Sequence, residues 1–368
     1  MAARQALARQ GSRQRAGSSL KTRIGNAGGG LVLLALWLAL WPAFAPSALA
    51  ASTLAAGYPS LPISLASPFA ETGQESLFPD LFLAALQAAS PQPVTLRRFP
   101  GRGGGYALRE ILGKPADGHS LAFTALPAFF LQAIPQNRLY SREDLAPLVC
   151  LAHVPTALWV LEESPLASVQ DLIALAHSLE AAKTSAPGAP DSESAPADAP
   201  LPLAGPGSYT DGQVAALLLA RAAGIHIRYL PFLNTAKAAE AVRSGDAAAC
   251  LGYALKTPPL PGLRPLAVAS KSRVPALPDT PTLREAGLEV IAGQDLGLAI
   301  PVGADQEDLA LIADFYLRLQ DAGNLRAGLL QNGFFPLRFS RAELAAFVQN
   351  REEELKAFIQ DYPLFPTR

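Results

Sequence analysis

Residues 93–112 read PVTLRRFPGRGGGYALREIL. Residues 93–99 have the composition of a short strand, a glycine-rich turn follows at 100–105, and 106–112 has the apolar spacing of a helix. The same order surrounds this stretch, with strands expected at 63–67 and 120–124 and a helix at 77–89. Strands that alternate with helices indicate βαβ units. The sequence therefore predicts an α/β protein with a largely parallel sheet.

The alternation continues toward the C-terminus. Two apolar runs, 148–154 and 157–161, are separated at Pro155. Further strands are expected at 202–204, 225–230, 247–253 and 266–269, and helices at 168–179, 211–223, 235–244, 305–321, 323–331 and 340–360. Ser168 with Asp171, Thr282 with Glu285 and Ser340 with Glu343 have the spacing of helix-capping pairs. Residues 181–200 are rich in Ala, Pro and Ser, which predicts a solvated insertion without a site.

The first 50 residues predict an export signal. Six basic residues and no acidic one come first, an apolar run of about 11 to 15 residues follows, and the segment ends Ala48-Leu49-Ala50. That run is shorter than the roughly 20 residues that span a bilayer. We expect cleavage after about Ala50 and a periplasmic protein.

The net charge of the exported chain bears on the partners it can bind. Removing those six basic residues from 30 leaves 24 against 31 acidic residues, a net charge of −7. An acidic surface disfavours nucleic acid as a partner.

Cys150 and Cys250 each lie in an apolar run, and we expect two buried thiols, although an oxidising compartment also permits a bridge.

The motifs of common enzymes are missing from the sequence. It has no G-x-S-x-G, H-E-x-x-H, C-x-x-C or Walker sequence, and its four histidines share no metal-ligand spacing. The turn at 100–105 lacks the third glycine of a dinucleotide fingerprint, because Tyr106 stands there. We therefore expect no catalytic residue, no metal and no cofactor. A secreted hydrolase using Ser208 or Thr210 with a distant histidine remains an alternative.

Several turns follow strands and precede helices. Backbone N–H groups at such turns favour an anion such as a carboxylate. The turns lie at 71–76, 100–106, 124–127, 205–211 and 233–235. We expect some of them to form a joint binding site.

An ordered set of short motifs runs along the chain. In order, they are Tyr58-Pro-Ser-x-Pro-Ile, Pro68-Phe, Pro100-Gly-x-Gly-Gly, Ala116-Asp-Gly-x-x-Leu, Asp144-Leu-Ala-Pro-Leu, Ser168-Val-x-Asp-Leu-Ile-Ala-Leu-Ala, Leu230-Pro-Phe, Leu266-Ala-Val-Ala-Ser and Leu277-Pro-Asp-x-Pro-Thr-x-x-Glu-Ala-Gly. They span residue 58 to the C-terminus, interrupted by the insertion at 181–200. In this order the motifs resemble those of the tripartite tricarboxylate transporter receptors of the Bug (TctC) type.

The resemblance implies an α/β, two-lobed type II periplasmic-binding-protein fold with two crossing hinge strands. Lobe one is expected at 58–151 plus 269–368, and lobe two at 152–268. It also implies a monomer that binds a small organic, carboxylate-containing ligand between the lobes and delivers it to permease subunits of a tripartite transporter. The ligand loops of the family are carried over to this sequence by position, and the turn after the third strand is added to them. The expected ligand contacts are Glu71, Thr72, Gly73, Gln74, Ser76, Gly101, Arg102, Gly103, Gly104, Tyr106, Thr124, Ala125, Gly207, Ser208, Tyr209, Thr210, Leu233, Asn234 and Thr235.

The first ligand loop departs from the family. It keeps a single glycine and places Glu71 and Glu75 where an anionic ligand is expected. Gly252-Tyr253 stands where the family usually has an Asp. Arg102 has the geometry to pair with a carboxylate through two hydrogen bonds. Two alternatives follow from the altered loop: a ligand that carries an amine or hydroxyls, or a diverged receptor that acts as a partner of a membrane sensor ectodomain without transport.

Overall fold

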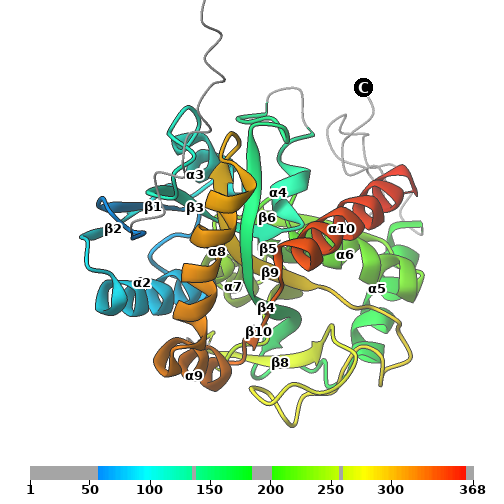
Figure 1. Cartoon of the computed structure of the whole chain (residues 1–368). Helices are drawn as coiled ribbons and strands as arrows, with labels where there is room; N and C mark the ends of the chain where they lie inside the picture. Colours follow the sequence, from blue (N-terminus) through cyan, green and yellow to red (C-terminus); the bar gives the residue numbers. More distant parts are fainter. Residues whose placement is uncertain (1–56, 135–137, 185–200, 257–259, 362–368) are drawn as a thin grey trace, which may run out of the picture. The chain divides into compact units, whose positions relative to one another are not determined.

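The computed structural model describes residues 57–134, 138–184, 201–256 and 260–361 (Figure 1). The predicted signal peptide at 1–50 and residues 185–200 of the predicted insertion lie outside this part of the chain. Residues 181–184 form the last turn of helix α5 (Val169–Thr184). Contacts divide the chain after Ala51, and all that follows concerns the unit Ser52–Arg368.

The strands form one continuous path in the order β2-β1-β3-β9-β4-β7-β5-β6, which falls into two half-sheets that meet in β4. The first half-sheet contains β1 (Ile63–Ser67), β2 (Val94–Arg98), β3 (Ser120–Leu126), β9 (Gly293–Pro301), β10 (Phe335–Pro336) and part of β4 (Leu145–Leu161). The second contains β5 (Leu201–Pro206), β6 (Ile227–Phe232), β7 (Ala249–Tyr253), β8 (Leu263–Val268) and the rest of β4.

Strand pairing is parallel at the outer side of each half-sheet. β1 pairs in parallel with β2 and β3, and β5 pairs in parallel with β6 and β7. The helices between these strands are α2 (Leu77–Ala89), α3 (Gly105–Glu110), α6 (Asp211–Ala223) and α7 (Thr235–Ser244). The prediction of βαβ units is confirmed in both half-sheets.

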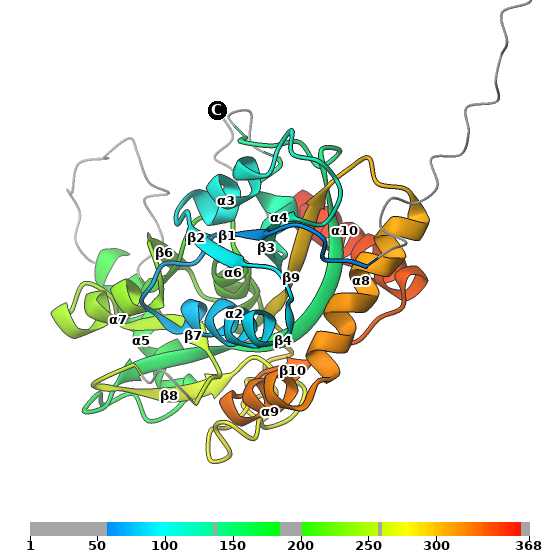
Figure 2. The same ribbon diagram turned by 60° about the vertical axis from the view of Figure 1, so that its left-hand side comes forward.

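The separation of two strands at Pro155 was wrong, because β4 runs unbroken through that residue (Figure 2). Pro155 is the last residue of β4 that pairs with β9, and Thr156 is the first that pairs with β7. A proline cannot donate to a strand ladder, and a point where the partner changes tolerates this loss. The Pro155 carbonyl still accepts a hydrogen bond from Ala254 N–H at 2.9 Å.

Strand β9 was not predicted. It lies at the centre of the first half-sheet, antiparallel to both β3 and β4. The chain passes between the half-sheets along β4 and again between β8 and β9, where Thr156 N–H donates to the Ala292 carbonyl at 2.9 Å. These two passages give the two-lobed α/β fold that the family resemblance implies.

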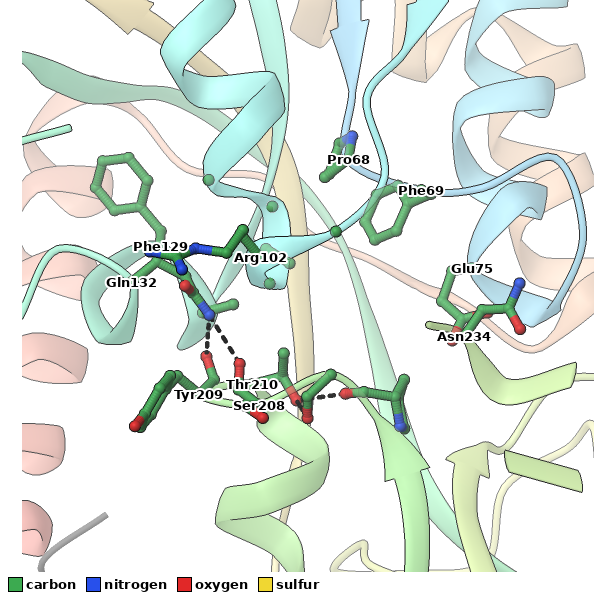
Figure 3. Close-up of a pocket in the computed structure, with 18 of the residues that line it drawn as sticks. Pro68, Phe69, Glu75, Arg102, Phe129, Gln132, Ser208, Tyr209, Thr210 and Asn234 are labelled. Atoms are coloured by element: carbon green, nitrogen blue, oxygen red, sulfur yellow. Dashed lines mark hydrogen bonds between the residues drawn. The ribbon is translucent and has the colours of Figure 1, made fainter. Parts of the chain in front are cut away.

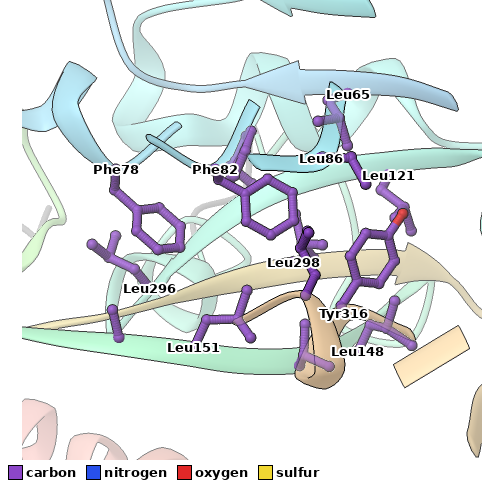
Figure 4. Packing of buried hydrophobic residues seen from close by; sticks show 14 of the residues in the cluster. Leu65, Phe78, Phe82, Leu86, Leu121, Leu148, Leu151, Leu296, Leu298 and Tyr316 are labelled. Atoms are coloured by element: carbon purple, nitrogen blue, oxygen red, sulfur yellow. The ribbon is translucent and has the colours of Figure 1, made fainter. Parts of the chain in front are cut away.

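Helices cover both faces of each half-sheet. On the first, α2, α8 (Gln306–Asp321) and α9 (Gly323–Asn332) pack on one face, while α3, α4 (Ala128–Leu131) and α10 (Arg341–Asp361) pack on the other. Phe82 is fully buried, and its ring lies 5.3 Å from that of Phe123 and 5.8 Å from that of Tyr316 (Figure 4). On the second, α5 and α6 cover one face and α7 the other.

Cys150 and Cys250 are both free and buried, in β4 and β7. The expectation of two buried thiols is confirmed. Burial raises the pKa of the Cys250 thiol to about 12, so this thiol stays protonated at neutral pH.

The capping pair at Ser168 is confirmed. Ser168 N–H donates to the Asp171 carboxylate at 2.8 Å, and Asp171 N–H donates to Ser168 Oγ at 3.2 Å. Thr282 and Glu285 make the same reciprocal bonds, but they close a turn at 283–287 and no helix follows.

Replacing Ser168 with alanine removes the acceptor for Asp171 N–H. We expect the free energy of unfolding to fall by about 1 kcal/mol, the usual cost of losing such a cap. Urea denaturation followed by circular dichroism measures this change. Ser178→Ala, on the exposed side of the same helix, should change stability by less than half as much, and equal losses in the two variants would contradict the capping role.

Candidate ligand-binding site

A cavity of about 620 Å³ opens between the two half-sheets, beyond the carboxyl ends of β1, β3, β5 and β6 (Figure 3). In open α/β sheets this is the edge where ligands bind. The first half-sheet contributes most of the apolar lining together with the charged residues Glu75, Arg102 and Arg138, and the second half-sheet contributes hydroxyl and amide groups. The lining includes Pro68, Phe69, Glu75, Leu108, Phe123, Ala128, Phe129, Gln132, Arg138, Leu139, Pro206, Pro231, Phe232, Tyr253 and Gln294.

Most of the predicted ligand contacts come together at this cavity. Of these, Gly101, Arg102, Gly103, Gly104, Thr124, Ala125, Gly207, Ser208, Tyr209, Thr210, Leu233 and Asn234 line it. They come from three turns and from the end of strand β3, since Thr124 and Ala125 lie within that strand and the turn expected to begin at 124 was wrong. Their meeting at one cavity is as expected for a joint site. Contact of each with a ligand stays a prediction.

The structure places the other predicted residues outside the lining: Glu71, Thr72, Gly73, Gln74, Ser76, Tyr106 and Thr235. Glu71 and Thr72 are exposed, and Tyr106 lies on the outer side of α3, where the Arg109 guanidinium is 5.4 Å from its ring centre. Most members of the first loop are thus turned away from the cavity, and Glu75 is the one that faces it together with Ala70.

The first loop joins the lobes through Gln74. Its side-chain amide donates to the Tyr253 carbonyl at 3.1 Å and accepts from Tyr253 N–H at 2.8 Å, as a neighbouring strand would. A Cβ at Gly252 would lie 2.8 Å from Gln74 Oε1. The two departures from the family pattern therefore belong together, because the missing side chain at 252 leaves room for Gln74.

Glu75 is bound at the start of α7. Its carboxylate accepts hydrogen bonds from Thr235 N–H and from the Thr235 hydroxyl, both at 2.8 Å. Burial raises the pKa of Glu75 to about 7, the hydrogen bonds from Thr235 oppose this rise, and the nearby Asp211 adds to it. Beside it, Asn234 donates to the Thr72 carbonyl at 3.0 Å.

The second loop holds Arg102 in an unusual conformation. Arg102 has φ 50°, in the left-handed region that non-glycine residues rarely adopt. It begins a short 3₁₀ turn, η2 (Arg102–Gly104), which leads into α3. Such strain is common where a side chain must be aimed at a ligand.

A second bridge between the lobes forms at Gln132. Its side-chain amide donates to the Ser208 carbonyl at 2.8 Å and to the Tyr209 carbonyl at 3.1 Å. Figure 3 shows these two bonds beside Arg102. Gln132 follows a short apolar helix, and nothing in the sequence marks it as a site residue.

Asp211 lies behind the cavity at the start of α6. Its Oδ1 accepts hydrogen bonds from Gln294 Nε2 at 2.6 Å and from the Tyr253 hydroxyl at 3.3 Å. Burial raises the pKa of Asp211 to about 6, against the effect of these bonds. Tyr253 and Gln294, which both line the cavity, are thus fixed by a buried acid that sequence reasoning did not select.

The groups present suit binding. None of the four histidines, all of which are described, lines the cavity, and the Thr210 hydroxyl already donates to the Pro206 carbonyl at 2.6 Å. Among the described residues no cluster of His, Cys, Asp or Glu has the geometry to hold a metal ion. Over the same part of the chain no helix has both the length and the apolar character needed to cross a membrane.

A two-lobed α/β fold, with a cavity between the lobes that both lobes line with polar groups, is the architecture of a solute-binding protein. The chain belongs to the tripartite tricarboxylate transporter family receptors, whose model matches residues 84–364. Members are periplasmic receptors and not enzymes, and they work with membrane subunits of a transporter.

Individual relatives are distant. The UPF0065 protein in the gbd 5′ region of Cupriavidus necator is 24% identical over 316 residues, which cover 85% of this chain and 91% of the relative. Two solved structures from Rhodopseudomonas palustris share the fold: Rpa4515 with adipate (20% identity, TM-score 0.71, 83% of this chain and 98% of that one) and MatC with bound malate (22%, 0.67, 81% and 98%).

Proposed function

We propose that this protein is an exported receptor that binds a small organic carboxylate in the cavity between its lobes and delivers it to the membrane subunits of a tripartite transporter. In this proposal lobe one comprises 58–151 plus 269–368, lobe two comprises 152–268, and the signal peptide is removed after about Ala50. The twelve lining residues predicted above are the proposed ligand contacts.

The observation that carries this proposal is the joint lining of one cavity by turns from both half-sheets, with Arg102 among them. A guanidinium beside backbone N–H groups suits a carboxylate. The apolar walls suit a carbon skeleton. Malate and adipate, bound by the two proteins of the same fold, have this chemistry.

Arg102→Gln tests the proposal. Charge-assisted hydrogen bonds contribute about 1.5–3 kcal/mol, so we expect carboxylate binding to weaken by roughly 10- to 100-fold. Calorimetric titration with a panel of aliphatic, aromatic and amino-substituted carboxylates measures it. Arg109→Gln is the matched control, because Arg109 lies outside the cavity on α3.

Native mass spectrometry of the purified protein adds an independent readout, because a tightly held ligand is carried through purification. If no carboxylate binds the unaltered protein and none co-purifies, the receptor proposal fails. Capture of a sensor ectodomain by such a ligand-free protein would then favour the signalling alternative.

A further inference from the structure

We infer, building on the proposed function, that the cavity selects a ligand with a single carboxylate and a neutral or cationic opposite end, because Glu75 already places an anion there. In Figure 3, Arg102 lies beside Gln132 and Ser208, while Glu75 lies beside Asn234 on the other side of the cavity. The two ends of the cavity therefore have opposite charge.

The donors at the Glu75 end are occupied by the protein itself. Thr235 N–H and its hydroxyl both donate to Glu75, and Lys237 N–H donates to the Asn234 side chain at 2.9 Å. The Asn234 amide donates in turn to the Thr72 carbonyl. A ligand carboxylate placed here would find these donors already bonded to the protein, which disfavours the start of α7 as a second anion site.

Charge repulsion also disfavours a second ligand carboxylate at the Glu75 end of the cavity. Glu75 is 9% exposed and Asp211 is 2% exposed, so a second carboxylate would be a third buried acid in this region. Like charges repel strongly where water is excluded. The raised pKa of Glu75 shows that the site already disfavours one negative charge. An ammonium group would instead pair with ionised Glu75, and a methyl group would let it stay protonated.

Three ligands with the same six-carbon chain isolate the effect of the distal group: hexanoate, 6-aminohexanoate and adipate. A rigid series of 4-methylbenzoate, 4-(aminomethyl)benzoate and terephthalate covers a second shape. At about pH 8, where Glu75 is largely ionised, we expect the dicarboxylate in at least one series to bind tenfold or more weakly than its methyl counterpart. The ammonium ligand should bind at least as well as the methyl one.

Glu75→Gln removes the charge and keeps an acceptor for Thr235 N–H. In this variant we expect the affinities within a series to differ by less than about threefold. Glu240→Gln changes charge equally on the exposed face of α7 and should keep the original order. Circular dichroism and the thermal midpoint establish that each variant is folded.

The outcomes separate the two proposals. If adipate and terephthalate each bind the unaltered protein as tightly as their methyl counterparts, the selectivity inference is wrong while the receptor function stands. The same holds if the ligand order survives in Glu75→Gln. If no ligand of either series binds and no member of the wider carboxylate panel binds, the receptor proposal fails. The selectivity inference, which rests on it, then fails as well.

Discussion

Replacing Gly103 with valine is expected to weaken carboxylate binding by about 100-fold or more. Gly103 has φ 55° and its Cα approaches the opposite lobe, so that an added Cβ would overlap the Gln132 amide and lie 3.1 Å from the Ser208 carbonyl oxygen. The two hydrogen bonds from Gln132 would be lost at about 1 kcal/mol each, and forcing a side chain into this packed contact between the lobes costs about a further 1–3 kcal/mol. Both costs fall on the arrangement in which the lobes meet around the ligand, and together they correspond to roughly two orders of magnitude or more in affinity.

Gly113→Val is the control that removes the ambiguity of backbone strain. Gly113 has φ 70°, and its Cβ would meet nothing within 4 Å. It should lose stability without losing affinity. Calorimetric titration gives the affinity, and small-angle scattering gives the radius of gyration, which should rise only in Gly103→Val because its lobes are held apart. Equal effects of both variants would contradict a steric role at the cavity.

The second large effect is a loss of stability as the pH rises. Glu75 and Asp211 have ordinary pKa values of 4.5 and 3.8, which the folded protein raises to about 7 and about 6. Between these values the folded protein holds protons that the unfolded chain has released. The resulting stabilisation is complete below the ordinary values and is lost as the pH rises through the folded ones. Each acid accounts for about 3 kcal/mol.

Thermal unfolding between about pH 4 and pH 8 measures this dependence. The midpoint should fall steadily through pH 6 and 7, and Glu75→Gln and Asp211→Asn should each flatten part of the curve. Ligand-free protein is needed, because a bound carboxylate changes the linkage. A midpoint that does not fall between about pH 6 and pH 8 in the unaltered protein, or a fall of the same size in both variants, would contradict the raised pKa values of these two acids.

The local architecture could be predicted where sequence spacing alone determines it. Strand β1, helix α2 and the caps at Ser168 and Ser340 coincide with the predictions. Strand β9 was missed because its buried residues follow no clear alternation, and its place is decided by pairing with β3 and β4. Pro155 predicts a break that the structure lacks, because the cost of a proline in a strand depends on which partner strand lies beside it.

The residues of the site also divide into those that could be predicted from the sequence and those that could not. Turns such as Gly101–Gly104 and Ser208–Thr210 were found because strand ends carry a recognisable composition. The roles of Gln74, Gln132 and Asp211 could not be found, because each depends on contacts between residues at least 42 positions apart. Family resemblance placed the whole first loop at the ligand, whereas Gln74 bonds to Tyr253 of β7, and Glu75 both lines the cavity and bonds to Thr235 of α7.

Pro155 has a consequence for motion. Any swing of one half against the other must be absorbed by the backbone that belongs to both, and β4 is the longest such stretch. A strand bends most easily where a hydrogen bond of the β-ladder is missing. Pro155 has no N–H to donate, so one such bond is missing at the residue where β4 changes partners. We expect the pivot of the molecule to lie at this residue, whose neighbours Val154 and Thr156 pair with the cavity-lining residues Gln294 and Tyr253.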